Sequence, residues 1–347
     1  MNRIMKKVRL KDIADATGFS VNTVSKALQN SSIISESTKA RIREKAREYG
    51  YVGDGIAGAL RSGVTKTIAV ILGDISNPHF SIMIKEIEHR VRKNGYNTFI
   101  LNTAEDTELE YAAIVSALHK SVDGIILCPS QKNSDNINFL KNTDTPFVLI
   151  GRYFPDIKTD YVICDDRQGG FLITEHLLKL GHERIAFFGG PAYVSSTRDR
   201  LRGYQDALYK GGVLYDPSMV FEVPLIRDEQ GEKMNEKLSQ AAWCTAIFAF
   251  SDIIAWEIIT RLQEQGRKVP EDVSVVGFDN IQSKFTFPFP LTSVRTSKSK
   301  MSVAASEILL DKMKPQKSQS QKIEYRQIII PTDVVERGSS RKVYVKG

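Results

Sequence analysis

The sequence predicts an α/β protein that carries a small all-helical head at its N-terminus. From Thr67 onward, short apolar runs alternate with amphipathic segments, which is typical of parallel sheets covered by helices. Before that point, KDIADATGFSVNTVSKALQN holds two short amphipathic helices around a glycine, a helix-turn-helix pattern. The charge is divided in the same way, because the head is basic and the rest of the chain is neutral.

The charge of the head points to a polyanionic partner. Residues 1–66 contain 13 of the 48 Lys and Arg residues but only 6 of the 41 Asp and Glu residues. The remaining 281 residues hold 35 of each kind. A basic surface on a small helical domain is the electrostatic footprint of a nucleic-acid binder. We therefore expect the head to bind nucleic acid and the neutral body to have another task.

The head is predicted to contain three short helices. Gly18 lies between the first two, where the turn requires a positive φ or close packing. Ser20 can cap the second helix, and a third, roughly Glu36–Tyr49, begins after Ser35. The outer face of the third helix is expected to carry Lys39, Arg41, Arg43, Lys45 and Arg47. In a helix-turn-helix the second helix lies in the major groove of DNA.

Head and body together resemble the LacI/GalR family of bacterial transcription regulators. The resemblance runs through LKDIADATGFSVNTVSKAL, ISESTKARIREKAREYGY and ALRSGVTKTIAVILGDISNPHF, and it continues to about Val335. It implies a DNA-binding domain at 1–52, a hinge at 53–65 and a two-lobed effector-binding and dimerisation domain at 66–340. The N-lobe is expected at about 66–162 and 292–322, and the C-lobe at about 163–291 and 323–340.

The resemblance places a set of head residues at the DNA. Val21, Asn22 and Lys26 fall where the family reads base edges: Asn22 can pair with adenine, and Lys26 can reach guanine O6 and N7. Lys replaces the more usual Arg and, as a point charge, discriminates less. Phosphate-contacting positions are matched by Ser20, Thr23, Ser25 and Ser35, while Gln29 replaces a common Asn. The alternative is that Thr23 and Ser25 only cap or solvate a helix and that Lys26 is one solvated charge among many.

The glycine-rich segment GDGIAGALRSG at 53–63 is predicted to be the hinge. Each glycine disfavours helix by roughly 1 kcal/mol relative to Ala, so the isolated segment should be mostly unstructured. The resemblance implies that it folds where two copies meet in the minor groove. Leu60 would then be the wedge that kinks the duplex, with Ala57 as a small neighbour. The alternative is a plain flexible linker, which Gly58 favours.

The body is predicted to form two doubly wound α/β lobes. Apolar runs such as TIAVIL (67–72) and DVSVVGF (272–278) are typical of buried parallel strands. The resemblance adds that the lobes have the type I periplasmic-binding-protein fold. Ligands of such sheets bind outside the carboxyl ends of the strands.

Polar and aromatic side chains follow these strand ends, and the resemblance assigns them to the effector. The expected contacts are Asn77, His79, Phe80, Ser196, Arg200, Ser251 and Asp279. Arginine donates to ring and hydroxyl oxygens while aspartate accepts from hydroxyls, which suits a polyhydroxylated ligand. The alternative is that Arg200 and Asp279 form an ion pair between the lobes and that Phe80 belongs to the core.

The first functional hypothesis is a dimeric, ligand-responsive transcriptional regulator, in this family most often a repressor. It would bind a palindromic operator in double-stranded DNA and sense a small molecule, which is expected to be a sugar or sugar derivative. The alternative is a solute-binding protein without a DNA role, which the basic head disfavours. Since no signal peptide is recognisable and no apolar run reaches 18 residues, we expect a cytoplasmic protein without membrane contact. A homodimer is expected because one head contacts too little DNA and the hinge needs a partner.

No catalytic residue, cofactor or metal is expected. The chain contains no G-x-G-x-x-G, P-loop or G-x-S-x-G motif, so an enzyme is disfavoured. Its cysteines follow no metal spacing: Cys128, Cys164 and Cys244.

Overall fold

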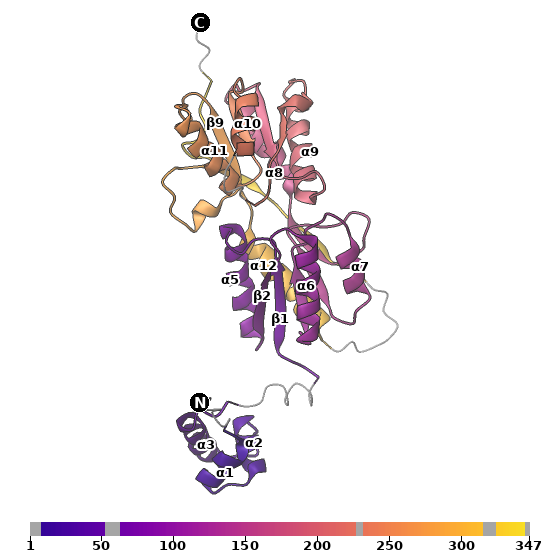
Figure 1. The fold of residues 1–347 in the computed structure, drawn as a ribbon, viewed down its shortest axis with the longest axis vertical. Coiled ribbons are helices and arrows are strands. Elements are labelled where there is room, and N and C mark those ends of the chain that lie inside the picture. The colour runs from indigo at the N-terminus through magenta and orange to yellow at the C-terminus, as the bar shows by residue number, and fades with distance from the viewer. Residues whose placement is uncertain (1–7, 53–62, 227–231, 315–323, 344–347) are drawn as a thin grey trace. The chain divides into compact units, whose positions relative to one another are not determined.

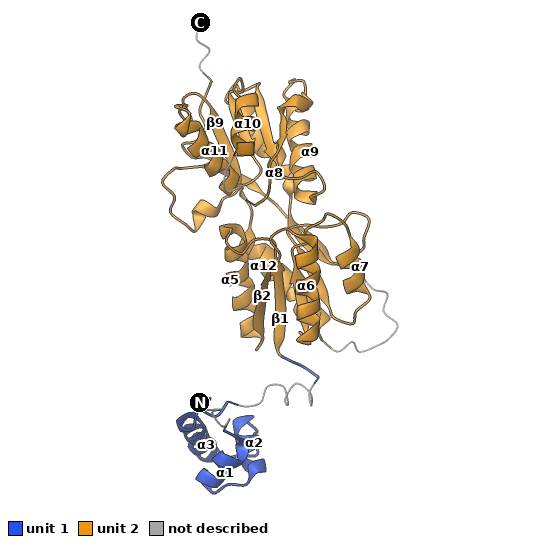
Figure 2. Ribbon diagram, viewed as in Figure 1, with its two compact units in different colours: residues 1–65 blue, residues 66–347 orange. Residues whose placement is uncertain are grey.

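The computed structural model describes residues 8–52, 63–226, 232–314 and 324–343. The chain divides into two compact units, residues 1–65 and residues 66–347 (Figure 2). The first is helical and the second contains two sheets covered by helices, so the predicted fold class is confirmed. No helix among the described residues is long and apolar enough to span a membrane.

The first unit is a three-helix head around a small core. Its helices are α1 (Leu10–Thr17), α2 (Val21–Leu28) and α3 (Glu36–Glu48). Gly18 ends α1 with φ 74°, the left-handed conformation that the predicted turn requires. The core forms where one apolar face of each helix meets the other two, and Ile13, Val24 and Ile42 are fully buried there.

The N-lobe of the second unit, in which Figure 1 labels β1 and β2, is built on a parallel six-stranded sheet with the strand order β11-β5-β4-β3-β1-β2. Its strands are β1 (Thr67–Leu72), β2 (Asn97–Asn102), β3 (Gly124–Leu127), β4 (Phe147–Ile150), β5 (Tyr161–Cys164) and β11 (Gln327–Ile330). Its helices are α5 (Pro78–Lys93), α6 (Thr107–His119), α7 (Asp135–Lys141) and α12 (Lys298–Lys312). Alternate strand residues face opposite layers, so Val70 packs with α5 and α12 while Ile71 packs with α6 and α7.

The C-lobe repeats this plan with the order β12-β10-β9-β8-β6-β7. Its strands are β6 (Ile185–Gly189), β7 (Val220–Glu222), β8 (Ala246–Ala249), β9 (Ser274–Asp279), β10 (Thr292–Arg295) and the antiparallel β12 (Asp333–Val335). Its helices are α8 (Asp166–Lys179), α9 (Ser195–Lys210), α10 (Glu232–Gln240) and α11 (Asp252–Glu264), with short 3₁₀ turns at Pro217–Met219 and Ile281–Ser283.

The chain crosses between the lobes three times: between β5 and α8, between β10 and α12, and between β11 and β12. Two strands therefore belong to a different lobe from the one that the expected bounds gave them. β10 was expected in the N-lobe segment 292–322 and joins the C-lobe, whereas β11, within 323–340, joins the N-lobe. Both are four-residue strands beside a crossing, and their apolar pattern does not say which sheet they extend.

Candidate functional site

Helix α2 of the head presents chemically varied side chains at its N-terminal end. Val21 is 45% exposed although it is apolar, Asn22 beside it is exposed, and Lys26 one turn later is half-buried. The N-terminal residues of a recognition helix are those that reach base edges. The helix thus offers a methyl surface, an amide and an ammonium group for base contacts, and their base-reading roles remain predictions.

The hydroxyl residues at the helix ends act as caps in the free protein. Ser20 Oγ accepts a hydrogen bond from the backbone N–H of Thr23 at 3.1 Å, and Ser35 Oγ accepts one from Thr38 N at 3.3 Å. Ser20 therefore caps α2 as predicted, and Ser35 caps α3. Since a hydroxyl has one donor and two lone pairs, capping leaves capacity for a phosphate.

Of the other predicted DNA contacts, two lie in the described part of the head and two do not. Ser25 is half-buried and Gln29 is exposed after the last turn of α2. The predicted hinge residues Ala57 and Leu60 lie outside the described residues. All of these phosphate and minor-groove roles remain predictions.

The outer face of α3 carries four of its five expected basic residues. The prediction was wrong for Lys39, which is 4% exposed and whose ammonium group pairs with Glu36 at 2.7 Å. It lies one turn before the buried Ile42, so its aliphatic stem extends the apolar stripe of the helix. Arg41 and Arg47 are exposed, so this face stays basic.

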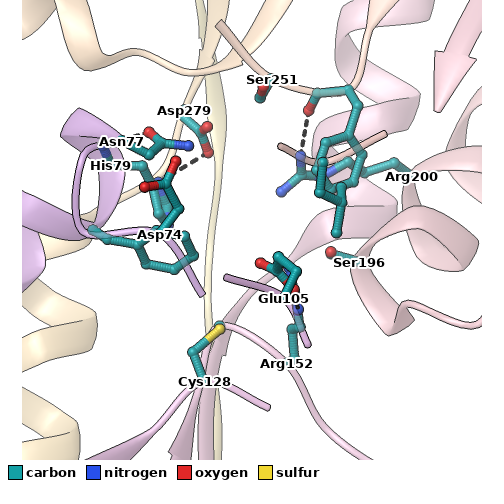
Figure 3. A pocket seen from close by; sticks show the side chains of 14 residues that line it. Asp74, Asn77, His79, Glu105, Cys128, Arg152, Ser196, Arg200, Ser251 and Asp279 are labelled. Atoms are coloured by element: carbon teal, nitrogen blue, oxygen red, sulfur yellow. Dashed lines mark hydrogen bonds and ion pairs between the residues drawn. The ribbon is translucent and has the colours of Figure 1, made fainter. Parts of the chain in front are cut away.

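All seven predicted effector residues line one cleft between the two lobes (Figure 3). Asn77, His79 and Phe80 come from the start of α5 in the N-lobe. The other four belong to the C-lobe: Ser196, Arg200, Ser251 and Asp279. The space left between the side chains has a volume of about 60 Å³, room for a few water molecules.

Two of these residues also fix the helices that border the cleft. Asn77 caps α5, its side chain accepting from His79 N at 2.9 Å, and Pro78 occupies the first turn. Ser251 caps α11 by accepting from Ile254 N at 3.3 Å. The cleft is therefore edged by helix N-termini whose orphan amides are already partly satisfied.

Arg200 is a buried arginine held entirely within the C-lobe. Its Nε donates to Asp166 Oδ1 at 2.8 Å and its Nη1 donates to the carbonyl of Phe250. The guanidinium carbon lies 4.3 Å from the ring centroid of Phe250 and 3.6 Å from that of Phe278. Burial raises the pKa of Asp166 to about 6, against the pull of Arg200.

Asp279 contacts an N-lobe side chain across the cleft. His79 Nδ1 of the N-lobe lies 3.1 Å from Asp279 Oδ1, a close electrostatic contact whose atoms are poorly aligned for a hydrogen bond. Burial alone would raise the pKa of Asp279, but His79 above all, with Arg200 and Lys298, holds it below its ordinary value. The contact of Asp279 with the opposite lobe is thus made by His79, whereas Arg200 lies in the same lobe as Asp279.

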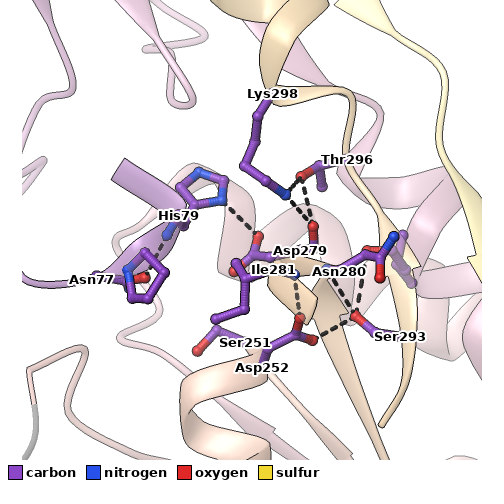
Figure 4. Close-up of polar contacts among 12 residues, drawn as sticks. Asn77, His79, Ser251, Asp252, Asp279, Asn280, Ile281, Ser293, Thr296 and Lys298 are labelled. Carbon is purple, nitrogen blue, oxygen red and sulfur yellow. Dashed lines mark hydrogen bonds and ion pairs between the residues drawn. The ribbon is translucent and has the colours of Figure 1, made fainter. Parts of the chain in front are cut away.

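The backbone turn that presents Asp279 is fixed by buried polar contacts (Figure 4). Asp279 and Asn280 adopt φ values of 113° and 50°, which few non-glycine residues do. Asp252, which is fully buried, accepts from Ile281 N at 2.8 Å and from Ser293 Oγ at 2.5 Å. Lys298 donates to the carbonyl oxygen of Asp279.

Phe80 combines both roles that the sequence left open. It is 8% exposed and packs in the main core cluster, yet its ring lines the cleft. Its ring centroid lies 5.3 Å from that of His79 at an interplanar angle of 84°. The two rings form one wall of the cavity.

Half of the cleft lining lies outside the seven residues that were assigned to the effector from the sequence. The additional residues are Asp74, Glu105, Cys128, Gly151, Arg152, Leu225 and Phe250. Cys128, Gly151 and Arg152 come directly after the ends of β3 and β4, so their position after a strand was a sequence signal that they face the cleft. Glu105 is the informative omission, because it binds the Arg152 guanidinium through two hydrogen bonds of 2.6 and 2.9 Å.

Comparison with known proteins identifies the two units. Residues 9–54 match the model of the bacterial regulatory proteins of the lacI family. Residues 65–337 match the periplasmic binding proteins and sugar binding domain of the LacI family.

Individual relatives extend over nearly the whole chain. The HTH-type transcriptional repressor PurR of Aliivibrio fischeri (strain MJ11) is 32% identical over 309 residues, covering 88% of this chain and 91% of the relative. A LacI family regulator from Enterococcus faecium, solved with bound ribose, is 29% identical with a TM-score of 0.68, covering 80% of this chain and all of that one. The lac repressor dimer bound to operator shares the fold at a TM-score of 0.81, with 22% identity over 97% of this chain and 100% of that one.

The family match of the head excludes a solute-binding protein without a DNA role, because both units match parts of one regulator family in the same order. This chain belongs to the LacI family of bacterial regulatory proteins and is a DNA-binding transcriptional regulator.

Proposed function

We propose that the protein is a dimeric cytoplasmic repressor, and not an enzyme, that responds to a carbohydrate bound between its lobes. The observation that carries the proposal is the convergence of Arg200, Asp279 and the His79–Phe80 wall on one cleft. A donor, an acceptor and an aromatic edge suit a ring with several hydroxyl groups. The LacI family relative solved with ribose supports this class of ligand.

The small volume of the cleft suggests how a ligand would act. Small-molecule pockets enclose roughly 300 Å³ or more, while about 60 Å³ is free here, so binding has to part the lobes or displace side chains. His79 and Asp279 join the lobes, and a ligand hydroxyl at Asp279 would replace that contact. Ligand binding is thereby coupled to the lobe arrangement, and through the hinge to the paired heads.

The test measures both sites in one preparation of the full chain. A thermal-shift screen of uncharged sugars and sugar derivatives identifies the ligand, and fluorescence anisotropy gives operator affinity with and without it. Linkage requires that operator DNA change ligand affinity by the factor by which ligand changes operator affinity. Arg200→Gln is expected to lose the ligand response while apo operator affinity stays nearly unchanged. An Arg200→Gln variant that stays fully responsive would place the ligand elsewhere.

A further inference from the structure

The charged side chains that line the cleft include two arginines that already have carboxylate partners. The arginines among the described lining residues are Arg152 and Arg200. Each guanidinium is already bonded to a carboxylate: Arg152 to Glu105, Arg200 to Asp166. Both arginines are buried, at 6% and 5% exposure, so these pairs are shielded from solvent.

Two further carboxylates face the same cavity. Asp279 is held beside His79, and Asp74 accepts from Ser76 N at 2.9 Å and from Ser76 Oγ at 2.6 Å, a pair of neutral donors. Among the described lining residues, each guanidinium therefore has a carboxylate neighbour, and three carboxylates stand against two guanidinium groups. A phosphate entering this space would lose its hydration and would meet carboxylates rather than a vacant guanidinium.

Glu105 is built into this position by the backbone around it. Ala104 and Glu105 have φ values of 50° and 56°, a left-handed pair that costs on the order of 1 kcal/mol per residue. At the end of β1, a Cβ on Gly73 would lie 2.1 Å from Glu105 Oε1. Any larger residue at position 73 would therefore require this carboxylate to shift from the place where it contacts Arg152, and two separate features of the chain serve the same contact.

We propose that Glu105 is a specificity residue that occupies Arg152 and, together with Asp166 on Arg200, restricts the cleft to uncharged polyhydroxylated effectors and excludes their phosphate esters. This inference rests on the proposed function of the cleft as the effector site. It assigns a role to a residue that lies outside the sequence-predicted set.

The experiment compares anion binding in variants of the full chain by isothermal titration with inorganic phosphate. Glu105→Gln keeps the shape of the side chain and removes its charge, and Gly73→Ala displaces the carboxylate without touching it chemically. Glu307→Gln is the matched control, because it frees Arg90 on the surface of the same lobe. We expect Glu105→Gln and Gly73→Ala to bind phosphate about tenfold or more tightly than the wild type and the control.

A second arm uses the wild-type protein, so the test does not depend on the folding of one variant. Thermal unfolding is followed with matched pairs of a sugar and its monophosphate ester, and only the uncharged member of a pair is expected to raise the melting temperature. Phosphate affinities equal in all variants, or esters that stabilise the wild type as well as their parent sugars, would overturn the inference and leave the effector site in place. If neither member of any pair binds but Glu105→Gln gains phosphate affinity, the inference holds and the carbohydrate assignment fails.

Discussion

Gln131 of the N-lobe caps the first turn of α9 in the C-lobe by accepting a hydrogen bond from Ser195 N at 2.9 Å. The residue at the N-cap position of α9 itself, Val194, has no side chain that can do this. Gln131 Nε2 donates to the carbonyl of Tyr153, and Tyr153 N donates to Ser195 Oγ at 3.2 Å. Because α9 also carries Arg200, this cap ties an effector-lining helix to the opposite lobe.

We predict that Gln131→Ala destabilises the body and loosens lobe closure. The substitution leaves the buried Ser195 amide without its acceptor, which costs about 1–3 kcal/mol. Urea unfolding should show this loss, and small-angle scattering should show a larger radius of gyration. Gln240→Ala, on the exposed end of α10, is the control and should change the free energy of unfolding by less than about 0.5 kcal/mol. An unchanged Gln131→Ala protein would mean that water replaces the cap.

The head and the alternation of strands and helices were predictable because they depend on local periods and turn residues. Gly18 and Ser20, which lie two positions apart, indicate the end of the first helix and the start of the second. The sheet membership of β10 and β11 was not predictable, since it is decided by pairing with strands far away in sequence. The hydrogen-bond partners of the cleft residues could not be predicted for the same reason. Arg200 was assigned to the cleft from its motif, but its partner Asp166 lies 34 positions earlier in the sequence.

We predict that Asp252 makes the free energy of unfolding decrease as pH rises. Burial above all, and then the charge of Asp279, raise its pKa from 3.8 to about 7. The folded state then holds this proton where the unfolded chain has lost it, so stability falls as pH rises from about 4 to about 7. The full shift corresponds to at most about 4 kcal/mol.

Asp252→Asn isolates this contribution, since the amide keeps the shape and does not titrate. Urea unfolding at about pH 5 and about pH 8 should show the wild type losing stability relative to the variant. Equal slopes for both proteins would show that Asp252 is ionised in the folded state.

We predict that α2 reads bases through Asn22 and Lys26. Selection of binding sites from random DNA should return an altered consensus for Asn22→Ala and Lys26→Ala, with about 1–3 kcal/mol lost on the wild-type operator. Lys11→Ala removes an exposed charge from α1 and should weaken binding to all sequences alike. If the consensus is unchanged in both α2 variants, these side chains do not contact bases.

We predict that Leu60 acts as a wedge in the minor groove when two hinge segments meet on the operator. Leu60→Ala removes the side chain that separates the central base step, an insertion that exchanges stacking energy of a few kcal/mol for a bent duplex. Operator affinity should fall by about tenfold or more, while affinity for unrelated DNA, which depends on charge, should stay nearly constant. Anisotropy titrations on both DNAs at one salt concentration measure this ratio, and a phasing assay measures the bend. A Leu60→Met variant keeps an apolar wedge and should retain most of both effects, whereas equal losses on the two DNAs in Leu60→Ala would mean that the segment only links head and body.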